Sequence, residues 1–169
     1  MPNLAPRFLR HAAALIALIA LALPVHANVL TGRVVAVADG DTITVLDAAR
    51  VQHKVRLAGI DAPEKGQPFG SRAKENLSRQ VYGRTVTVEW QKTDRYGRVV
   101  GVVMNKGHDV NLEQVRAGLA WWYREYAREQ SPDDRQRYEA AEADARRAQR
   151  GLWQNSHPTP PAEWRRTRR

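Results

Sequence analysis

The sequence predicts an α+β fold, in which a closed five-stranded β-barrel has three α-helices packed outside it. Five short segments have alternating apolar residues, and three longer segments carry apolar residues at helical spacing. Most of the strand segments precede most of the helical ones, and the five-stranded OB-type β-barrel suits this order. The 169 residues are enough for one domain with its own core and too few for two comfortable ones.

The strands are predicted from the alternation of apolar with small or polar residues, which is typical of a half-buried strand. An Asp-Gly pair at residues 39–40 separates the first two alternating segments and favours a tight hairpin turn. Ile43 and Val45 then alternate with threonines, and an Ala-Ala pair at residues 48–49 gives the next connection. Three strands are therefore expected within residues 31–58, one over 85–89 and one over 99–104.

Three helices are predicted from start and stop signals around a stripe of apolar residues. Ser71 is expected to cap the first helix, which Gly83 ends. Asn111 is expected to cap the second, with Gln114 three residues later. A Ser-Pro pair at residues 131–132 opens the third, and two aspartates follow where the helix dipole favours negative charge. The apolar stripes are Ala73, Leu77 and Val81; Leu112, Val115 and Leu119; and Tyr138, Ala141, Ala145 and Ala148.

The first 27 residues have the features of a secretory signal peptide. Arg7 and Arg10 give a positive start, and an unbroken apolar run covers residues 12–23. Val25 and Ala27 then supply small residues at the two positions that a signal peptidase reads. The run is too short for a membrane-spanning helix, which needs about 20 residues. We expect residues 1–27 to be cleaved and the protein to be exported, either to the periplasm or as a secreted protein. An uncleaved membrane anchor is the alternative.

The chain is strongly basic, with 27 lysines and arginines against 18 acids and a formal net charge of +9. Such an excess favours a polyanionic partner, either nucleic acid or an anionic membrane surface. The absence of cysteine excludes disulfides, thiolate metal sites and cysteine nucleophiles. The catalytic domain is expected to span residues 28–155, and residues 156–169 form a Pro/Arg-rich tail whose charged end is expected to be solvated.

Three expected turns concentrate acidic and arginine side chains. Each turn has a simpler interpretation, because Asp-Gly, proline and glycine are ordinary turn residues. Taken together they are harder to dismiss, since Asp41 starts one strand and Asp61 closely follows another, so that adjacent strands could bring them together. Two converging carboxylates repel unless a cation lies between them. The turns are residues 39–42, 61–64 and 94–98.

The side chains in these turns suit phosphodiester hydrolysis. Carboxylate oxygens, carbonyls and waters are ligands for a hard cation, and no cysteine or histidine cluster competes. Calcium in a loose site is expected, with Mg²⁺ or Mn²⁺ as less favoured alternatives. Arg56 and Arg98 would bind two phosphate oxygens each, and more tightly as negative charge grows in the transition state. Glu64 would activate a water.

The motifs resemble the thermonuclease, or staphylococcal nuclease-like, family over about residues 32–153. Each motif alone is weak, but their order and spacing over most of the chain are specific. The resemblance implies an OB-type barrel with three helices and a calcium-dependent endonuclease that cuts DNA and RNA with little sequence preference. Its products would carry 3′-phosphate and 5′-hydroxyl ends. The matching segments are residues 39–42, 55–57, 60–64, 94–98, 111–120 and 151–153.

The resemblance also implies roles for individual residues. Asp41 and Asp61 would be carboxylate ligands of calcium, and the backbone carbonyl of Ala62 would be a third ligand. Ala62 stands where the founding member of the family has threonine, which matters little if only the carbonyl binds. The following loop, residues 65–69, is shorter than in longer relatives. The catalytic residues would be Arg56, Glu64 and Arg98.

Four further residues are implied to bind substrate. Arg95 and Tyr96 match positions that hold a neighbouring phosphate. Tyr126 matches one of two nucleotide-stacking tyrosines, whereas Arg124 occupies the place of the other, with Tyr123 beside it. Aromatic stacking gives sequence-tolerant affinity of about 1–3 kcal/mol per base.

Two other functions compete with the nuclease. OB-type barrels also bind oligonucleotides without cutting them, so a non-catalytic nucleic-acid-binding module is the main alternative. A basic envelope protein that associates with anionic lipid through its arginine tail is the other. Neither needs the clustered acids and arginines, which favours the enzyme. A monomer with no obligate protein partner is expected, in contact with a membrane only if the signal segment stays uncleaved.

Overall fold

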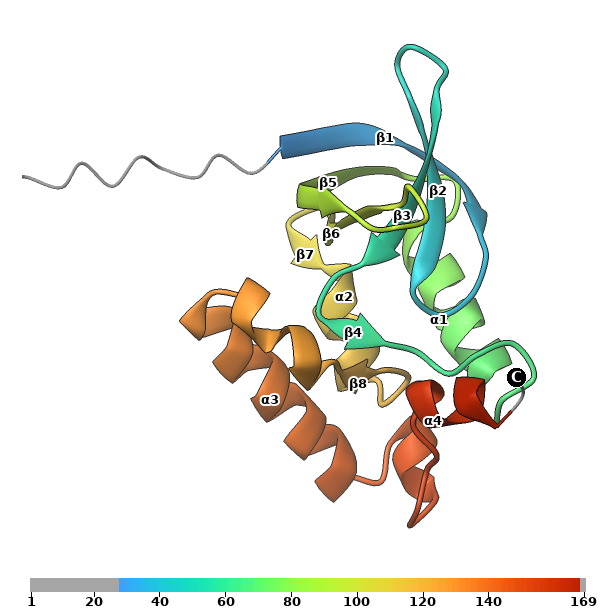
Figure 1. Ribbon diagram of the computed structural model, residues 1–169, viewed down its shortest axis with the longest axis vertical. Coiled ribbons are helices and arrows are strands. Elements are labelled where there is room, and N and C mark those ends of the chain that lie inside the picture. The colour runs from blue at the N-terminus through green and yellow to red at the C-terminus, as the bar shows by residue number, and fades with distance from the viewer. Residues whose placement is uncertain (1–27, 168–169) are drawn as a thin grey trace, which may run out of the picture.

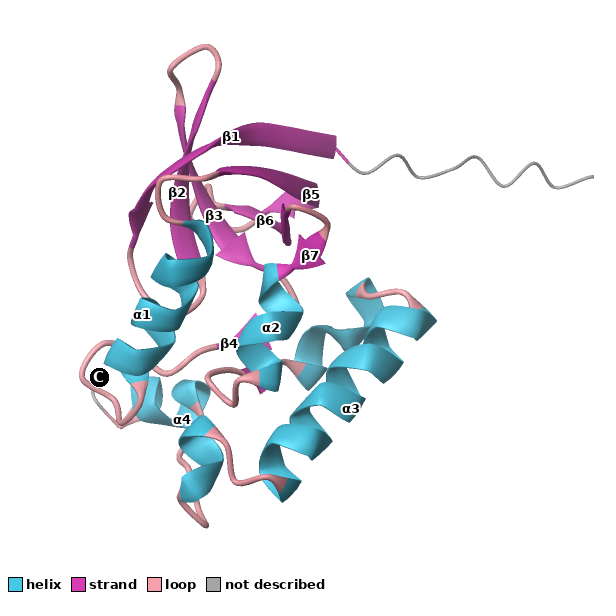
Figure 2. Cartoon of the chain, turned by 180° about the vertical axis from the view of Figure 1, so that it is seen from behind, coloured by secondary structure: helices cyan, strands magenta, loops and turns pink. Residues whose placement is uncertain are grey.

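The computed structural model describes residues 28–167, so the signal-peptide prediction for residues 1–27 lies outside the described residues. A bent sheet forms a barrel, α1 and α2 lie against one end of it, and α3 and α4 lie beyond (Figure 1). The view from behind shows the same arrangement, with α2 between the barrel and α3 (Figure 2). Within residues 28–167, no helix has both the length and the apolar character needed to cross a bilayer.

The barrel consists of five strands and closes through a parallel pair. Four antiparallel pairings link β3, β2, β1, β5 and β6 in that order. The parallel pairing of β3 with β6, with Val55 opposite Val99 and Leu57 opposite Gly101, then joins the two ends. Register shifts in β1–β2 and β5–β6 mark bulges that bend the sheet. The predicted five-stranded barrel is confirmed. Its strands are β1 (Asn28–Val37), β2 (Thr42–Asp47), β3 (Gln52–Leu57), β5 (Thr85–Thr93) and β6 (Val99–Asn105).

Short elements outside the barrel connect it to the helical layer. β4 pairs antiparallel with β8, which places Asp61 opposite Trp121. β7 extends the sheet beyond β6 and leads directly into α2. The sequence patterns did not predict these two-residue strands, because two residues are too few to show an alternation. Their bounds are β4 (Ile60–Asp61), β7 (His108–Asp109) and β8 (Trp121–Trp122).

The three predicted helices are present, together with a fourth short helix in the tail. Ser131 caps α3 as expected, since its side chain accepts a hydrogen bond from the Asp134 N–H. Two predicted caps are wrong. α1 begins at Gly70 without a side-chain cap, and Asp109 caps α2 in place of Asn111. The elements are α1 (Gly70–Val81), α2 (Val110–Arg116), η1 (Arg124–Glu129), α3 (Pro132–Arg147), η2 (Gly151–Gln154) and α4 (Pro161–Arg166), where η denotes a 3-10 helix.

Asn111 lies in the core and connects α2 to the barrel. Its side chain is fully buried. The Oδ1 atom accepts the Val103 N–H at 3.1 Å, and the Nδ2 atom donates to the carbonyls of Ala58 and Gly101 at 3.0 and 3.1 Å. Gly101 and Val103 belong to β6, and Ala58 directly follows β3. A side chain in use as an interior cross-link cannot also cap a helix.

Asn111→Ala is expected to lower the free energy of unfolding by about 3 kcal/mol. The substitution leaves the Val103 N–H and the Ala58 carbonyl without this partner, whereas the Gly101 carbonyl still accepts the Ala58 N–H. Each unsatisfied group costs about 1–3 kcal/mol with partial relaxation. Urea unfolding measures the change, and the exposed Asn155→Ala serves as a matched control. A loss below about 0.5 kcal/mol for Asn111→Ala, the range of an ordinary surface change, would contradict this role.

Candidate active site

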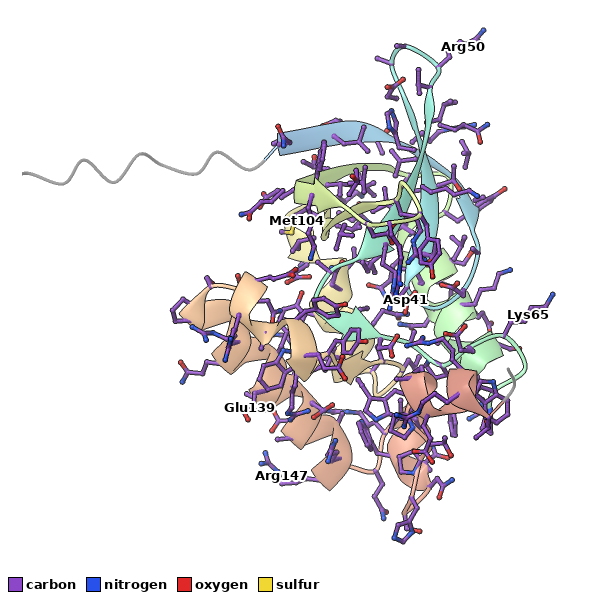
Figure 3. All side chains as sticks on the ribbon, viewed as in Figure 1. Asp41, Arg50, Lys65, Met104, Glu139 and Arg147 are labelled. Carbon is purple, nitrogen blue, oxygen red and sulfur yellow. The ribbon has the colours of Figure 1, made fainter. Side chains whose placement is uncertain are left out.

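A cavity of about 420 Å³ opens at the end of the barrel that faces the helices. Figure 3 shows Asp41 at this end, between the barrel and the helical layer, whereas Lys65 points outward from the neighbouring loop. The cavity walls come from the turn before β2, the end of β3, the loop after β4, the β5–β6 turn, η1 and α4. Predicted site residues that line it are Asp41, Arg56, Ala62, Glu64, Arg95, Tyr96, Arg98, Tyr123 and Tyr126.

The first hairpin turn fixes Asp41 in the wall. The Asp39 Oδ1 atom accepts the Asp41 N–H at 3.0 Å, and the Asp41 carbonyl accepts the Leu57 N–H at 2.8 Å. The Asp41 Oδ2 atom accepts the Ala62 N–H at 2.7 Å, which links this turn to the loop after β4. Burial and the neighbouring Asp41 carboxylate raise the pKa of Asp39 to about 6. Asp39 therefore organises the turn that presents Asp41.

Arg56 joins the two predicted metal-ligand carboxylates. It forms an ion pair with Asp41, and its Nη2 atom lies 2.8 Å from Asp61 Oδ1. Asp41 and Asp61 are 6% and 3% exposed, so this pairing is largely shielded from water. Burial alone would lower the pKa of Arg56, but the two carboxylates raise it above its usual value, which keeps the guanidinium charged. The predicted convergence of the two turns is therefore present.

The turn between β5 and β6 holds Arg98 through Asp94. One Asp94 oxygen accepts the N–H groups of Tyr96 and Arg98 at 2.9 and 3.0 Å. The other binds the Arg98 guanidinium through Nε and Nη2, both at 2.7 Å. Desolvation tends to raise the pKa of Asp94, but the hydrogen bonds from Arg98 lower it below the usual value. Asp94 lies in the predicted motif, but no role was predicted for it. Its separation from Arg98 by four residues across a turn could have indicated this contact.

Barrel closure brings the two predicted arginines to one cavity. Arg56 lies opposite Val100 in the parallel β3–β6 pair, and Arg98 immediately precedes β6. Both arginines line the cavity. Their proximity therefore follows from the same strand pairing that closes the sheet.

Glu64 lies in the loop after β4, with its backbone and side chain both held. Its N–H donates to Gln67 Oε1 at 2.9 Å. Its Oε1 atom lies 2.5 Å from Nη1 of Arg165 in α4. The expectation that the charged end of the tail is solvated is wrong for Arg165, which reaches into the cavity. No local pattern indicated this contact, since it joins residues 101 positions apart.

Aromatic side chains lie at the rim of the cavity. Tyr96 is 69% exposed, and Tyr126 is 44% exposed. Tyr123 packs edge-on against Tyr126 at a ring separation of 4.9 Å. By contrast, Arg124 pairs with Glu142 of α3 at 2.7 Å, so it does not replace the second stacking tyrosine in the cavity. An exposed aromatic face beside a cavity lined by arginines suits an unstacked base next to its phosphate.

The oxygen-rich side of the cavity fits a hard divalent cation. Asp41 and Asp61 already share one cationic partner, the Arg56 guanidinium, so both carboxylates can reach a single positive charge. Over residues 28–167, no group of three or more His, Cys, Asp or Glu side chains is clustered as a complete metal site. Two carboxylates with a backbone carbonyl and waters would be the kind of loose oxygen set that calcium accepts.

The comparisons with known proteins agree with this geometry. Residues 54–155 match the model of the staphylococcal nuclease homologue family. The chain belongs to this family. Membership makes the chain a nuclease, a hydrolase that acts on nucleic acid, as the sequence motifs predicted. The family match covers Arg56, β4 with Asp61, the following loop with Glu64, and the turn that carries Arg98.

Relatives of the chain are similar over most of its length. A micrococcal nuclease of Shigella flexneri is 42% identical over 167 residues, which is 94% of this chain and 92% of the relative. An uncharacterized endonuclease of Haemophilus influenzae is 41% identical over 136 residues, 80% of this chain and 73% of the relative. Protein ParB of Escherichia coli is 40% identical over 164 residues, 92% of this chain and 89% of the relative.

Proposed function

We propose that the chain of this nuclease family is a calcium-dependent endonuclease that hydrolyses DNA and RNA with little sequence specificity. The observation that carries the proposal is the ion pairing of Arg56 with both Asp41 and Asp61, beside a cavity that Asp41, Arg56, Glu64 and Arg98 line. A non-catalytic binding module would need a basic aromatic surface but not a buried acid–arginine cluster. We further propose that the protein acts after export, in the periplasm or outside the cell.

Calcium would bind to Asp41, Asp61 and the Ala62 carbonyl, and would polarise a phosphate oxygen and a water when bound. Arg56 and Arg98 would each donate hydrogen bonds to non-bridging phosphate oxygens. These donors strengthen as the phosphorus becomes five-coordinate and gains charge. Because Asp94 already holds the Arg98 guanidinium, little reorganisation is needed in the transition state.

Glu64 would take a proton from the attacking water. Its side chain is 35% exposed, which leaves it accessible to solvent in the cavity. Cleavage of the bond to the 5′-oxygen would leave a 3′-phosphate and a 5′-hydroxyl. Arg95 and Tyr96 would contact a neighbouring phosphate, while Tyr126 and Tyr123 would stack against a base. Base stacking does not read hydrogen-bonding edges, and it therefore accounts for low sequence preference.

Purified protein is expected to degrade single-stranded DNA, double-stranded DNA and RNA when calcium is present, and to stop when EGTA is added. Gel assays of plasmid and RNA, followed by end-group analysis of the products, measure this. Restoring calcium after EGTA controls for irreversible loss of structure. Salt-sensitive DNA binding without cleavage under calcium, magnesium or manganese would overturn the proposal in favour of a binding module.

A further inference from the structure

The C-terminal helix α4 supplies a third arginine to the cavity. Arg165 Nη1 lies 2.5 Å from Glu64 Oε1 and 3.3 Å from Asp61 Oδ1, and Nη2 lies 3.2 Å from Asp61 Oδ2. One guanidinium group therefore joins the proposed base to a proposed metal ligand. Its side chain is 39% exposed, so it enters the cavity from the rim. Figure 1 shows α4 beside the loop that follows β4.

The approach of α4 to this loop is held by a buried glutamine. Gln67 is 6% exposed; its Oε1 atom accepts the Glu64 N–H at 2.9 Å, and its Nε2 atom donates to the Thr159 carbonyl at 2.7 Å. Pro160 precedes α4 and Pro161 is buried at its first position, and both have fixed backbone φ. The same side chain thus positions the backbone of Glu64 and the segment that delivers Arg165.

We propose that Arg165 is a positioning residue that holds the Glu64 carboxylate for proton transfer and also opposes calcium binding at Asp61. The inference rests on the proposed function, which assigns Glu64 and Asp61 their roles. A half-exposed glutamate in a loop samples several rotamers, and a charged hydrogen bond at 2.5 Å selects one of them. Without the guanidinium, Gln67 still holds the Glu64 backbone, but the Glu64 carboxylate loses the hydrogen bond that selects its rotamer.

The second effect has the opposite sign. Asp61 accepts hydrogen bonds from Arg56 and from both terminal nitrogens of Arg165. A cation that binds the Asp61 carboxylate must replace one of these contacts or share the oxygens with a nearby positive charge. Either event weakens binding of the cation, because like charges repel at short range even in a high dielectric. Removal of Arg165 should therefore help calcium bind and harm proton transfer.

The test uses Arg165→Ala, Arg165→Lys and, as a matched control on the same helix, the exposed Arg166→Ala. Calorimetry with calcium chloride in the absence of nucleic acid measures affinity, and initial rates on DNA at saturating calcium give kcat and KM. Arg165→Ala is expected to bind calcium about three- to tenfold more tightly. Its kcat is expected to fall about 10- to 100-fold, as on loss of a residue that orients a catalytic group, with a smaller change in KM.

The other variants separate charge from geometry. Arg165→Lys keeps the charge without the planar two-pronged donor, so its calcium affinity should be near that of the unsubstituted protein and its kcat intermediate. Arg166→Ala should change both quantities by less than about twofold, since exposed charges contribute little. An unchanged kcat in Arg165→Ala overturns the proposal. So does weaker calcium binding in Arg165→Ala together with normal binding in Arg165→Lys. Failure of the proposed function is distinct, because the unsubstituted protein itself would then neither bind calcium nor cleave DNA.

Discussion

Arg98→Ala and Arg56→Ala are each expected to lower kcat on DNA by about 10³- to 10⁵-fold, the contribution of a positioned arginine in phosphoryl transfer. The reason is that negative charge grows on the phosphate as water attacks, while both guanidinium groups line the cavity where this occurs. Arg98→Ala is the cleaner of the two variants, because the partner it leaves, Asp94, lies in a solvent-accessible turn. Arg56→Ala also leaves two buried carboxylates facing each other.

The kcat of Glu64→Gln decides whether the arginines or the proposed base contribute more. Its expected loss of kcat is smaller, about 10²- to 10⁴-fold, as for a general base. Arg147→Ala controls for the loss of net charge. Arg147 belongs to α3, and Figure 3 shows its side chain pointing away from the barrel. Rates measured at saturating calcium and DNA test all four variants. Turnover near that of the unsubstituted protein in both cavity arginine variants would show that charge stabilisation does not dominate.

Asp41→Ala is expected to lower the free energy of unfolding by about 3–5 kcal/mol, the cost of removing one partner of a buried ion pair. The change leaves the Arg56 guanidinium with a single buried carboxylate and the Ala62 N–H without an acceptor. It also removes a proposed calcium ligand, so nuclease activity should be lost.

Asp41→Asn separates these two effects. The amide oxygen can still accept from the Ala62 N–H, so this variant should be more stable than Asp41→Ala, yet it should bind calcium poorly because the site has lost a charge. Urea unfolding and calcium calorimetry on both variants measure the difference. Equal stability of Asp41→Ala and the unsubstituted protein would contradict the structural role of this buried network.

The sequence predicted features that depend on local patterns. Alternation at Ile43 and Val45 identified β2, and the Ser-Pro pair at residues 131–132 identified the start of α3. The position of Asp41 at a strand start and of Asp61 just past a strand end also predicted that their turns would converge, because adjacent strands can bring such positions together. The convergence of Asp41, Arg56 and Asp61 follows that expectation.

Features that depend on distant partners escaped prediction. Asn111 has the local signature of a cap, but the carbonyls of Ala58 and Gly101 compete for its amide, and that competition exists only in the folded barrel. The contact of Arg165 with Glu64 likewise depends on how α4 docks. A run of arginines near the end of a chain is indistinguishable, by composition alone, from a solvated tail.

The parallel pairing of β3 with β6 has a consequence for when the enzyme becomes active. The four antiparallel pairings do not by themselves bring β3 next to β6; the parallel pair does so. Without the parallel pair, Arg56 and Arg98 would lie at opposite edges of an open sheet, and one phosphate could not bind to both. We therefore expect cleavage of nucleic acid only from chains in which the β3–β6 pair has formed.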